Sequence, residues 1–310
     1  MSYLSHYLVL NKIHIQNANA ISSPLTYGFP SLNGFIGAIH ALNRKVKNNF
    51  PGIRLDGTLI ACHDYRLHAY RPYNLADYTF NLTRNPIKKD GKTAAIVEEG
   101  RIDLTVSLVI EIYNDVDLSE NEALQQKLLD YIQKQIMQQR LASGSVMHVQ
   151  KTSLIPAYGE EGITPIINSL IPAFVLMDAS QELIDITNEL KASNPDATAL
   201  DALIETTTLH HVPETNDDTP DSIQWKTKSV KTGRGWIVPI TVGYQGLSEL
   251  FPPGELENCR TPEYPSQYVE CIYSLGKWVF PYRIEDNFNS AFWRYTQPEN
   301  NLYLITQTEY

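Results

Sequence analysis

The sequence predicts an α+β fold in which helices cover one face of an antiparallel β-sheet. Residues 103–113 alternate apolar and polar side chains, which is the pattern of a half-buried strand. Two segments place apolar residues at helical spacing, and each lies between strand-like segments. The predicted elements of the first half therefore follow the order β-α-β-β-α-β.

The first strand is predicted at residues 7–15, and a helix at residues 31–48 follows it. Ser31 stands where a serine side chain can cap the first turn of that helix. The apolar face of the helix consists of Phe35, Ile39, Leu42 and Val46.

The second and third strands are predicted at residues 58–70 and 103–113, and the fourth at about residues 146–155. Before the fourth strand, Ser119 and Glu122 form a capping box that begins a second helix. This order is that of the ferredoxin-like or RRM-type sandwich, in which four antiparallel strands carry two helices on one face.

A long excursion, residues 71–101, separates the second strand from the third. We expect a projecting hairpin, or thumb, because Asp90-Gly91 is a turn signal flanked by three lysines. An exposed loop without fixed structure is the alternative.

The C-terminal half has a weaker pattern. We expect a division into an RRM-like domain at residues 1–155 and an irregular mixed α/β region at 156–310 that packs on it. Within this region we predict a strand at 173–178, short helices at 180–191 and 198–206, and an acidic, solvated loop at 212–222.

Charge is distributed unevenly along the chain, whose net charge is −10. Residues 1–101 hold 12 basic and 6 acidic side chains, whereas residues 102–310 hold 13 and 29. A basic N-terminal third suits a polyanion such as RNA, and an acidic remainder suits cationic protein partners. A solvated basic face is the alternative.

Several chemistries are not expected. The three cysteines are widely spaced and form no C-x-x-C pair, so neither a disulfide framework nor a metal site is predicted, and no cofactor is expected. Lys92 resembles the lysine of a P-loop, but Pro86 stands where that motif requires glycine. No run approaches the roughly 20 apolar residues that span a bilayer. We therefore expect a cytoplasmic protein with no membrane partner.

Catalytic residues are not predicted either. The eight histidines are the natural candidates for general acid and base in a metal-independent nuclease, but no second group stands at a spacing that marks a pair. We expect that the chain is not an enzyme.

Two segments have the composition of an RNA-binding surface. Residues 15–45 combine short hydrogen-bonding side chains with glycines that permit close backbone approach, although structural scaffolding would look the same. Residues 225–236 place four basic residues between two tryptophans, which can grip phosphates and stack bases. A basic hairpin edge is the alternative there.

Five segments closely resemble the type I-F CRISPR-associated Cas-five family, also called Csy-two. They are residues 15–45, FNLTRNP (80–86), DGKTAAIVEEGR (90–101), GWIVPI (235–240) and the run from PGELENCRTPEYP to SLGKWVFPYR (253–283). The resemblance spans nearly the whole chain and is weakest at about 145–230.

This resemblance implies a non-catalytic subunit of the type I-F surveillance complex (the Csy complex, or Cascade). The family has an RRM-like core with a thumb and holds the 5′ handle of the CRISPR RNA together with the large subunit. It also abuts the first backbone subunit, and it meets target DNA through the assembled complex.

The candidate RNA-binding residues fall into three groups. Handle contacts are expected from Asn17, Asn19, Ser22, Ser23 and Tyr27. Thumb contacts are expected from Arg84, Asn85, Lys88, Lys89, Lys92 and Arg101, and a second clamp from Arg234 and Trp236. The alternatives are a metal-independent CRISPR repeat RNA endonuclease on the same fold and an adaptor that touches only protein.

Overall fold

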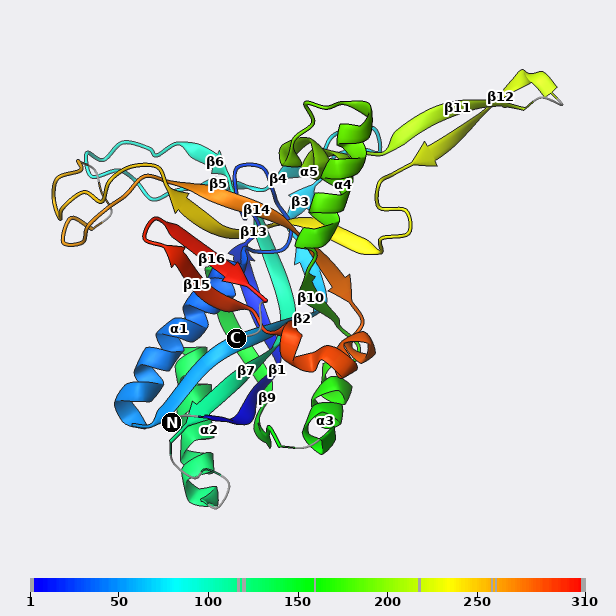
Figure 1. The fold of residues 1–310 in the computed structure, drawn as a ribbon. Helices are drawn as coiled ribbons and strands as arrows, with labels where there is room; N and C mark the ends of the chain where they lie inside the picture. Colours follow the sequence, from blue (N-terminus) through cyan, green and yellow to red (C-terminus); the bar gives the residue numbers. More distant parts are fainter. Residues whose placement is uncertain are drawn as a thin grey trace.

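The computed structural model describes residues 3–115, 118, 121–158, 160–216, 219–257, 259 and 261–307, with the backbone alone at 160, 161, 214–216 and 219–223. The first half contributes strands β1 (Tyr3–Asn19), β2 (Ile53–Leu67), β7 (Arg101–Asn114), β8 (Arg140–Leu141) and β9 (Gly144–Pro156). The second half contributes β10 (Phe174–Asp178), β13 (Trp236–Gly246), β14 (Val269–Val279), β15 (Arg294–Glu299) and β16 (Leu302–Thr306). All ten form one antiparallel sheet in the order β15-β16-β13-β14-β10-β2-β7-β1-β9-β8 (Figure 1).

The predicted α+β class with an antiparallel sheet is confirmed. The two predicted helices are α1 (Leu32–Asn49) and α2 (Glu122–Met137), and the expected alternation appears as β1-α1-β2-β7-α2-β9. Ser119 of the predicted capping box lies outside the described residues. The cap of α2 is Asn121, whose side chain accepts a hydrogen bond from the Leu124 amide at 3.0 Å.

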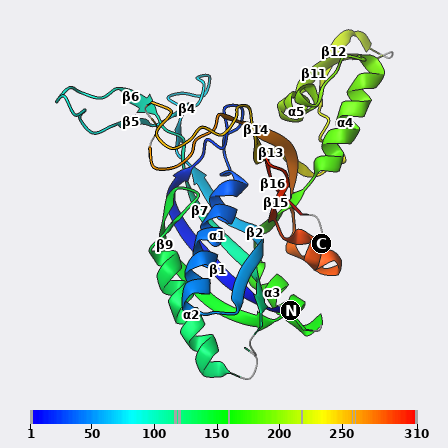
Figure 2. The same ribbon diagram turned by 60° about the vertical axis from the view of Figure 1, so that its left-hand side comes forward.

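Helices α1 and α2 lie side by side on one face of the sheet (Figures 1 and 2). Their apolar residues, including Phe35, Leu42 and Ile132, pack on inward-facing side chains of β1 and β7 in the main core. The helical spacing read from the sequence therefore marks the buried face of each helix.

The opposite face of the sheet is covered over part of its length. Helix α3 (Glu160–Leu170) and the 3-10 segment η1 (Pro281–Ala291) pack against Tyr7, Val9 and Val109. The prediction of a half-buried third strand is wrong for this part of β7, because a second layer buries Val109 on the face expected to meet solvent. Neither α3 nor η1 was predicted from the sequence. Their role as a second layer becomes clear only from their packing against the sheet.

The C-terminal prediction is confirmed for β10, α4 (Ser180–Ser193) and α5 (Ala199–Thr207). The predicted loop at 212–222 is wrong, because β11 (His210–Asn216) and β12 (Thr219–Lys228) pair there as an antiparallel hairpin. Cross-strand hydrogen bonds satisfy the backbone of a polar segment whose composition alone suggests a loop.

The sheet crosses the boundary expected between residues 155 and 156. Val175 of β10 pairs with Ala61 of β2, and Thr58 exchanges backbone hydrogen bonds of 3.0 Å with Trp293. The division into 1–155 and 156–310 stays a prediction.

Two hairpins project from one end of the sheet in different directions (Figures 1 and 2). One is the β11–β12 pair. The other, the 71–100 hairpin, contains β4 (Thr79–Phe80), β5 (Leu82–Arg84) and β6 (Ile96–Glu98), and β4 pairs with β3 (Ala69–Tyr70), which precedes it. Its tip turns at the predicted Asp90-Gly91, where the Gly91 amide donates to the Lys88 carbonyl at 2.9 Å and Gly91 has φ +76°. No helix within the described part of the chain is long and apolar enough to cross a membrane.

Candidate nucleic-acid interface

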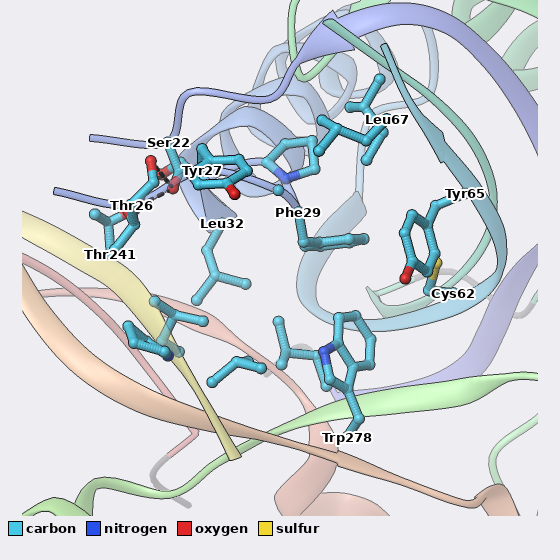
Figure 3. A pocket seen from close by; sticks show the side chains of 18 of the residues that line it. Ser22, Thr26, Tyr27, Phe29, Leu32, Cys62, Tyr65, Leu67, Thr241 and Trp278 are labelled. Carbon is cyan, nitrogen blue, oxygen red and sulfur yellow. Dashed lines mark hydrogen bonds between the residues drawn. The ribbon is translucent and has the colours of Figure 1, made fainter. Parts of the chain in front are cut away.

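A cavity of about 750 Å³ lies at the end of the sheet from which the hairpins project. Its lining includes the connection between β1 and α1, the end of β2, strands β10, β13 and β14, and Lys231. Figure 3 shows Tyr27 and Phe29 from the connection, Tyr65 from β2 and Trp278 from β14 lining one space. We call this cavity the groove.

Aromatic side chains form much of the groove wall. The ring of Phe29 stacks on Phe35 at 5.5 Å and meets Trp278 edge-on at 4.9 Å. Trp236 lies 6.4 Å from Trp278, contacts Phe174 edge-on at 5.5 Å, and remains 49% exposed. Exposed rings held by other rings offer flat faces on which bases can stack.

The connection between β1 and α1 is held by its own side chains. The Ser23 hydroxyl is buried, accepts from the Leu25 and Thr26 amides, and lies 2.7 Å from the Thr26 hydroxyl. The Ser22 hydroxyl also lies 2.7 Å from Thr26 Oγ1, and the Asn19 amide donates to the Ile21 carbonyl at 2.8 Å. Asn19, Ser22 and Ser23 are predicted RNA contacts. In this structure their side chains hold the loop in its conformation, as the scaffolding alternative proposes.

A second cavity of about 430 Å³ continues the groove toward the 71–100 hairpin. Tyr27 and Leu67 line both cavities, and Tyr78 and Phe80 line the second. Tyr27 is 65% exposed and contacts Phe80 edge-on at 5.3 Å. The predicted handle residue Tyr27 therefore stands at the junction of the two cavities.

The predicted thumb residues lie along the hairpin and at its base. Exposed side chains on β5 and around the tip are Arg84, Asn85, Lys88, Lys89 and Lys92. The ammonium group of Lys92 lies 3.5 Å from Asp90. At the base, Arg101 Nε donates to Glu99 at 3.0 Å, and another guanidinium nitrogen donates to the carbonyl of Asn17 at 3.4 Å.

The predicted second clamp is divided between two environments. Trp236 lines the groove, but Arg234 points toward α4. Arg234 Nε donates to Glu182 at 3.1 Å, its other nitrogens bond Glu189 and the Val230 carbonyl, and its side chain is 20% exposed. Two acidic partners balance the Arg234 charge, whereas Lys231 is the cation that lines the groove.

Cys62 and His63, which also line the groove, do not bond to one another as a nucleophile and base, because the Cys62 thiol donates to the Asp64 carbonyl at 3.7 Å and both ring nitrogens of His63 have other partners. Burial raises the pKa of the Cys62 thiol to about 12. Burial lowers the pKa of His63, whose ring nitrogens lie 2.7 Å from the Ser107 hydroxyl and 3.0 Å from the Pro172 carbonyl. All three cysteines are free, and the described residues contain no group of three or more His, Cys, Asp or Glu placed to hold a metal.

Sequence reasoning missed most of the groove wall. Phe29, Tyr65, Phe174 and Trp278 come from four distant segments, and an aromatic residue in a strand is more often core than surface. Of the aromatic residues in the wall, Tyr27 and Trp236 were predicted from the sequence.

Comparison with known proteins gives one consistent family. Residues 8–305 match the family described as CRISPR-associated protein (Cas_Csy2). The chain is also 36% identical over 312 aligned positions to the CRISPR-associated protein Csy2 of Pseudomonas aeruginosa (strain UCBPP-PA14), covering 96% of this chain and 93% of that protein. A match over nearly the full length, together with the resemblance seen in the sequence, establishes that the chain belongs to the Csy2 family of CRISPR-associated proteins.

Proposed function

We propose that this chain is a non-catalytic subunit of a type I-F RNA-guided surveillance complex and that it binds the 5′ handle of the CRISPR RNA. The observation that carries the proposal is the groove. It combines stacked, partly exposed aromatic rings with a lysine, and its extension reaches the base of a hairpin with a cationic tip. Single-stranded RNA is bound by this combination of stacking platforms and positive charge.

The handle would lie in the groove between Tyr27 and Trp236, with its bases against the aromatic walls. Its phosphates would extend toward Lys88, Lys89 and Lys92 of the hairpin, which in this proposal is the family thumb. Asn19, Ser22 and Ser23 would act by holding the β1–α1 connection in the conformation that forms the groove wall.

The strand order supports an RRM-type core. Strands β2, β7, β1 and β9 are adjacent and antiparallel, and α1 and α2 lie on one face, as in a ferredoxin-like sandwich. In this protein the four strands would be the RNA-binding centre of the larger sheet. The acidic second half, with α4 and the β11–β12 hairpin, is suited to contact the large subunit and the first backbone subunit.

Co-purification tests the function. The chain is expressed with a CRISPR array and the other subunits of its locus, purified through this chain, and the bound RNA is sequenced. We expect uniform guides with an intact 5′ handle and a large partner subunit. A chain recovered without RNA, or with partner proteins only, would contradict the proposal.

Matched tryptophan variants test the groove. Trp236→Ala removes one groove wall and is expected to weaken binding by about 1–3 kcal/mol, the value of one base stacked on an aromatic ring. Trp225→Ala is the control, because Trp225 is 65% exposed on β12 and does not line the groove. Equal effects of the two substitutions would argue against handle binding in the groove.

The hairpin charges are tested by salt dependence. Lys88→Gln and Lys89→Gln are each expected to reduce the slope of log K against log salt by about 0.7, the value for one phosphate contact on a single strand. An unchanged slope would remove the hairpin tip from the RNA path. The same purified material incubated with labelled repeat RNA tests catalysis, and a single metal-independent cut would contradict the non-catalytic assignment.

A further inference from the structure

The sheet face opposite α1 and α2 has an open half that the groove does not include. Toward one end of the sheet this face is covered by α3 and η1. The cover stops near the Asn11 amide, which donates to the Ser169 carbonyl at 3.3 Å, and His63, which lies 3.0 Å from the Pro172 carbonyl. Beyond these contacts, side chains of β9, β1, β7 and β2 form a polar surface, which we call the open face.

Strand register assembles the open face from residues distant in sequence. His148 of β9 pairs with His14 of β1, which pairs with Thr105 of β7, and Thr105 pairs with Asp64 of β2. The His14 and His148 rings are stacked at 6.1 Å with an interplanar angle of 26°, and both residues are exposed. His14 is further oriented by Thr105, whose hydroxyl lies 3.2 Å from its Nδ1.

The charge of the open face is mainly positive. Lys12 lies two residues before His14 on β1, and Lys151 of β9 pairs with Asn11, so both lysines stand on the same side of the histidine pair. Neither has an acidic partner within 4.0 Å in the part of the chain that the structure describes. Asp103 is neutralised, since His68 lies 2.9 Å and Arg66 3.5 Å from its carboxylate. In the row of paired residues that runs from His148 through His14 and Thr105 to Asp64, the acidic side chain is Asp64.

The open face is continuous with the groove through a gap in the sheet. Strand β10 pairs with β2 at Ala61 and Cys62, and among the described residues no strand pairs with residues 63–67 of β2 on that side. His63 and Asp64 line the groove at this gap, and the His63 ring is bonded to Ser107 on the open face. A flexible chain lying in the groove can therefore pass around the end of β2 without crossing a strand.

We propose that the guide RNA continues from the groove through the gap at residues 63–67 and crosses the open face, where its bases stack on the His14–His148 pair. Lys12 and Lys151 hold its phosphates beside the pair. Single-stranded RNA fits this surface because it offers both phosphates for the cations and flat bases for the exposed rings. This inference rests on the proposed function and extends the RNA path to the second side of the sheet.

Binding of fluorescein-labelled single-stranded RNA with the handle sequence followed by guide nucleotides, measured by anisotropy on the chain purified with its partner subunits, tests the proposal. The double variant His14→Ala/His148→Ala is expected to bind at least about fivefold more weakly, which corresponds to the loss of one stacked base. His40→Ala is the matched control, because His40 is an exposed histidine on α1, on the opposite side of the sheet.

A second variant separates loss of contact from loss of folding. Lys151→Glu changes an exposed residue of β9 and is also expected to weaken binding and to lower its salt dependence. If the wild-type chain binds no handle RNA, the proposed function fails. If the wild type binds, Trp236→Ala weakens binding and the open-face variants do not, the present inference is overturned while the groove assignment stands. The inference would also be overturned if the open-face variants lost binding to single-stranded DNA or to a protein subunit but still bound the RNA.

Discussion

The ion pair between Glu111 and Arg294 joins the two halves of the sheet. Glu111 lies on β7 and is 2% exposed, and Arg294 begins β15 and its side chain is 10% exposed. An Arg294 nitrogen donates to one carboxylate oxygen of Glu111. Gly57 packs against both side chains, and a Cβ atom at this position would overlap them. The pair therefore fills a tightly packed space between the two halves of the chain.

Removal of Arg294 leaves a carboxylate buried without a cation. For Arg294→Ala we expect a loss of about 3–5 kcal/mol in the free energy of unfolding, the usual cost of breaking a buried pair. Replacing both residues by leucine is expected to recover most of this loss, because no charge is then buried. Arg283→Ala, at an exposed position of η1, is the control and should stay within about 0.5 kcal/mol.

The loss should depend on pH. Burial raises the pKa of Glu111 and Arg294 opposes that rise, so the pKa should rise further in Arg294→Ala. A carboxyl group with a raised native pKa contributes stability that is present below its unfolded pKa and lost as pH rises through its native pKa. The deficit should therefore be larger at pH 7.5 than at pH 5, with a slope of at most about 1.4 kcal/mol per pH unit.

Urea unfolding followed by tryptophan fluorescence measures the free energy of unfolding of the wild type and of Arg294→Ala at pH 7.5 and at pH 5. A deficit below about 1 kcal/mol for Arg294→Ala, or one that does not shrink at pH 5, would refute the assignment of a buried, mutually dependent pair. The double variant also serves as a test of packing, since an equally large loss there would mean that volume and not charge is the cause.

Two further predictions concern packing and reactivity. Gly243→Ala should lower the melting temperature, with a loss of about 1–3 kcal/mol, because the new Cβ would overlap the Tyr303 carbonyl and force β16 away from β13; Gly37→Ala, which meets open space on α1, should instead stabilise by about 0.5–1 kcal/mol. Cys62 should react slowly with iodoacetamide at pH 8, because its pKa is raised to about 12, and mass spectrometry should find rapid labelling once urea exposes it. Rapid labelling of the folded chain would contradict the burial of this thiol.

The local elements were predictable because their signals are local. The apolar spacing of α1 and the alternation of β7 report which side chains face the main core, and both agree with the structure on that face. The Asp90-Gly91 turn was also predictable, since glycine tolerates the positive φ that the turn requires. Family membership likewise follows from linear motifs spread over the chain.

Three features depended on contacts that no short segment records. The buried second face of β7 requires α3 and η1, which lie far from it in sequence. The β11–β12 hairpin requires two polar stretches to pair, and the extension of the sheet requires β10 to pair with β2. Such long-range pairing decides whether a polar or apolar stretch becomes strand, because the free energy lies in the partner and not in the segment itself.

Part of the candidate site was likewise predictable from the sequence, and part of it was not. The α+β class, the two helices, the cationic hairpin tip and the Csy2 family could be predicted from the residues alone. The grouping of Trp236 with Phe29 and Trp278 in one groove, and the balancing of Arg234 by Glu182 and Glu189, became visible only in the folded chain. The reason is physical: composition reports which charges and rings a chain contains, whereas their availability to a ligand depends on neighbours that folding brings from distant parts of the chain.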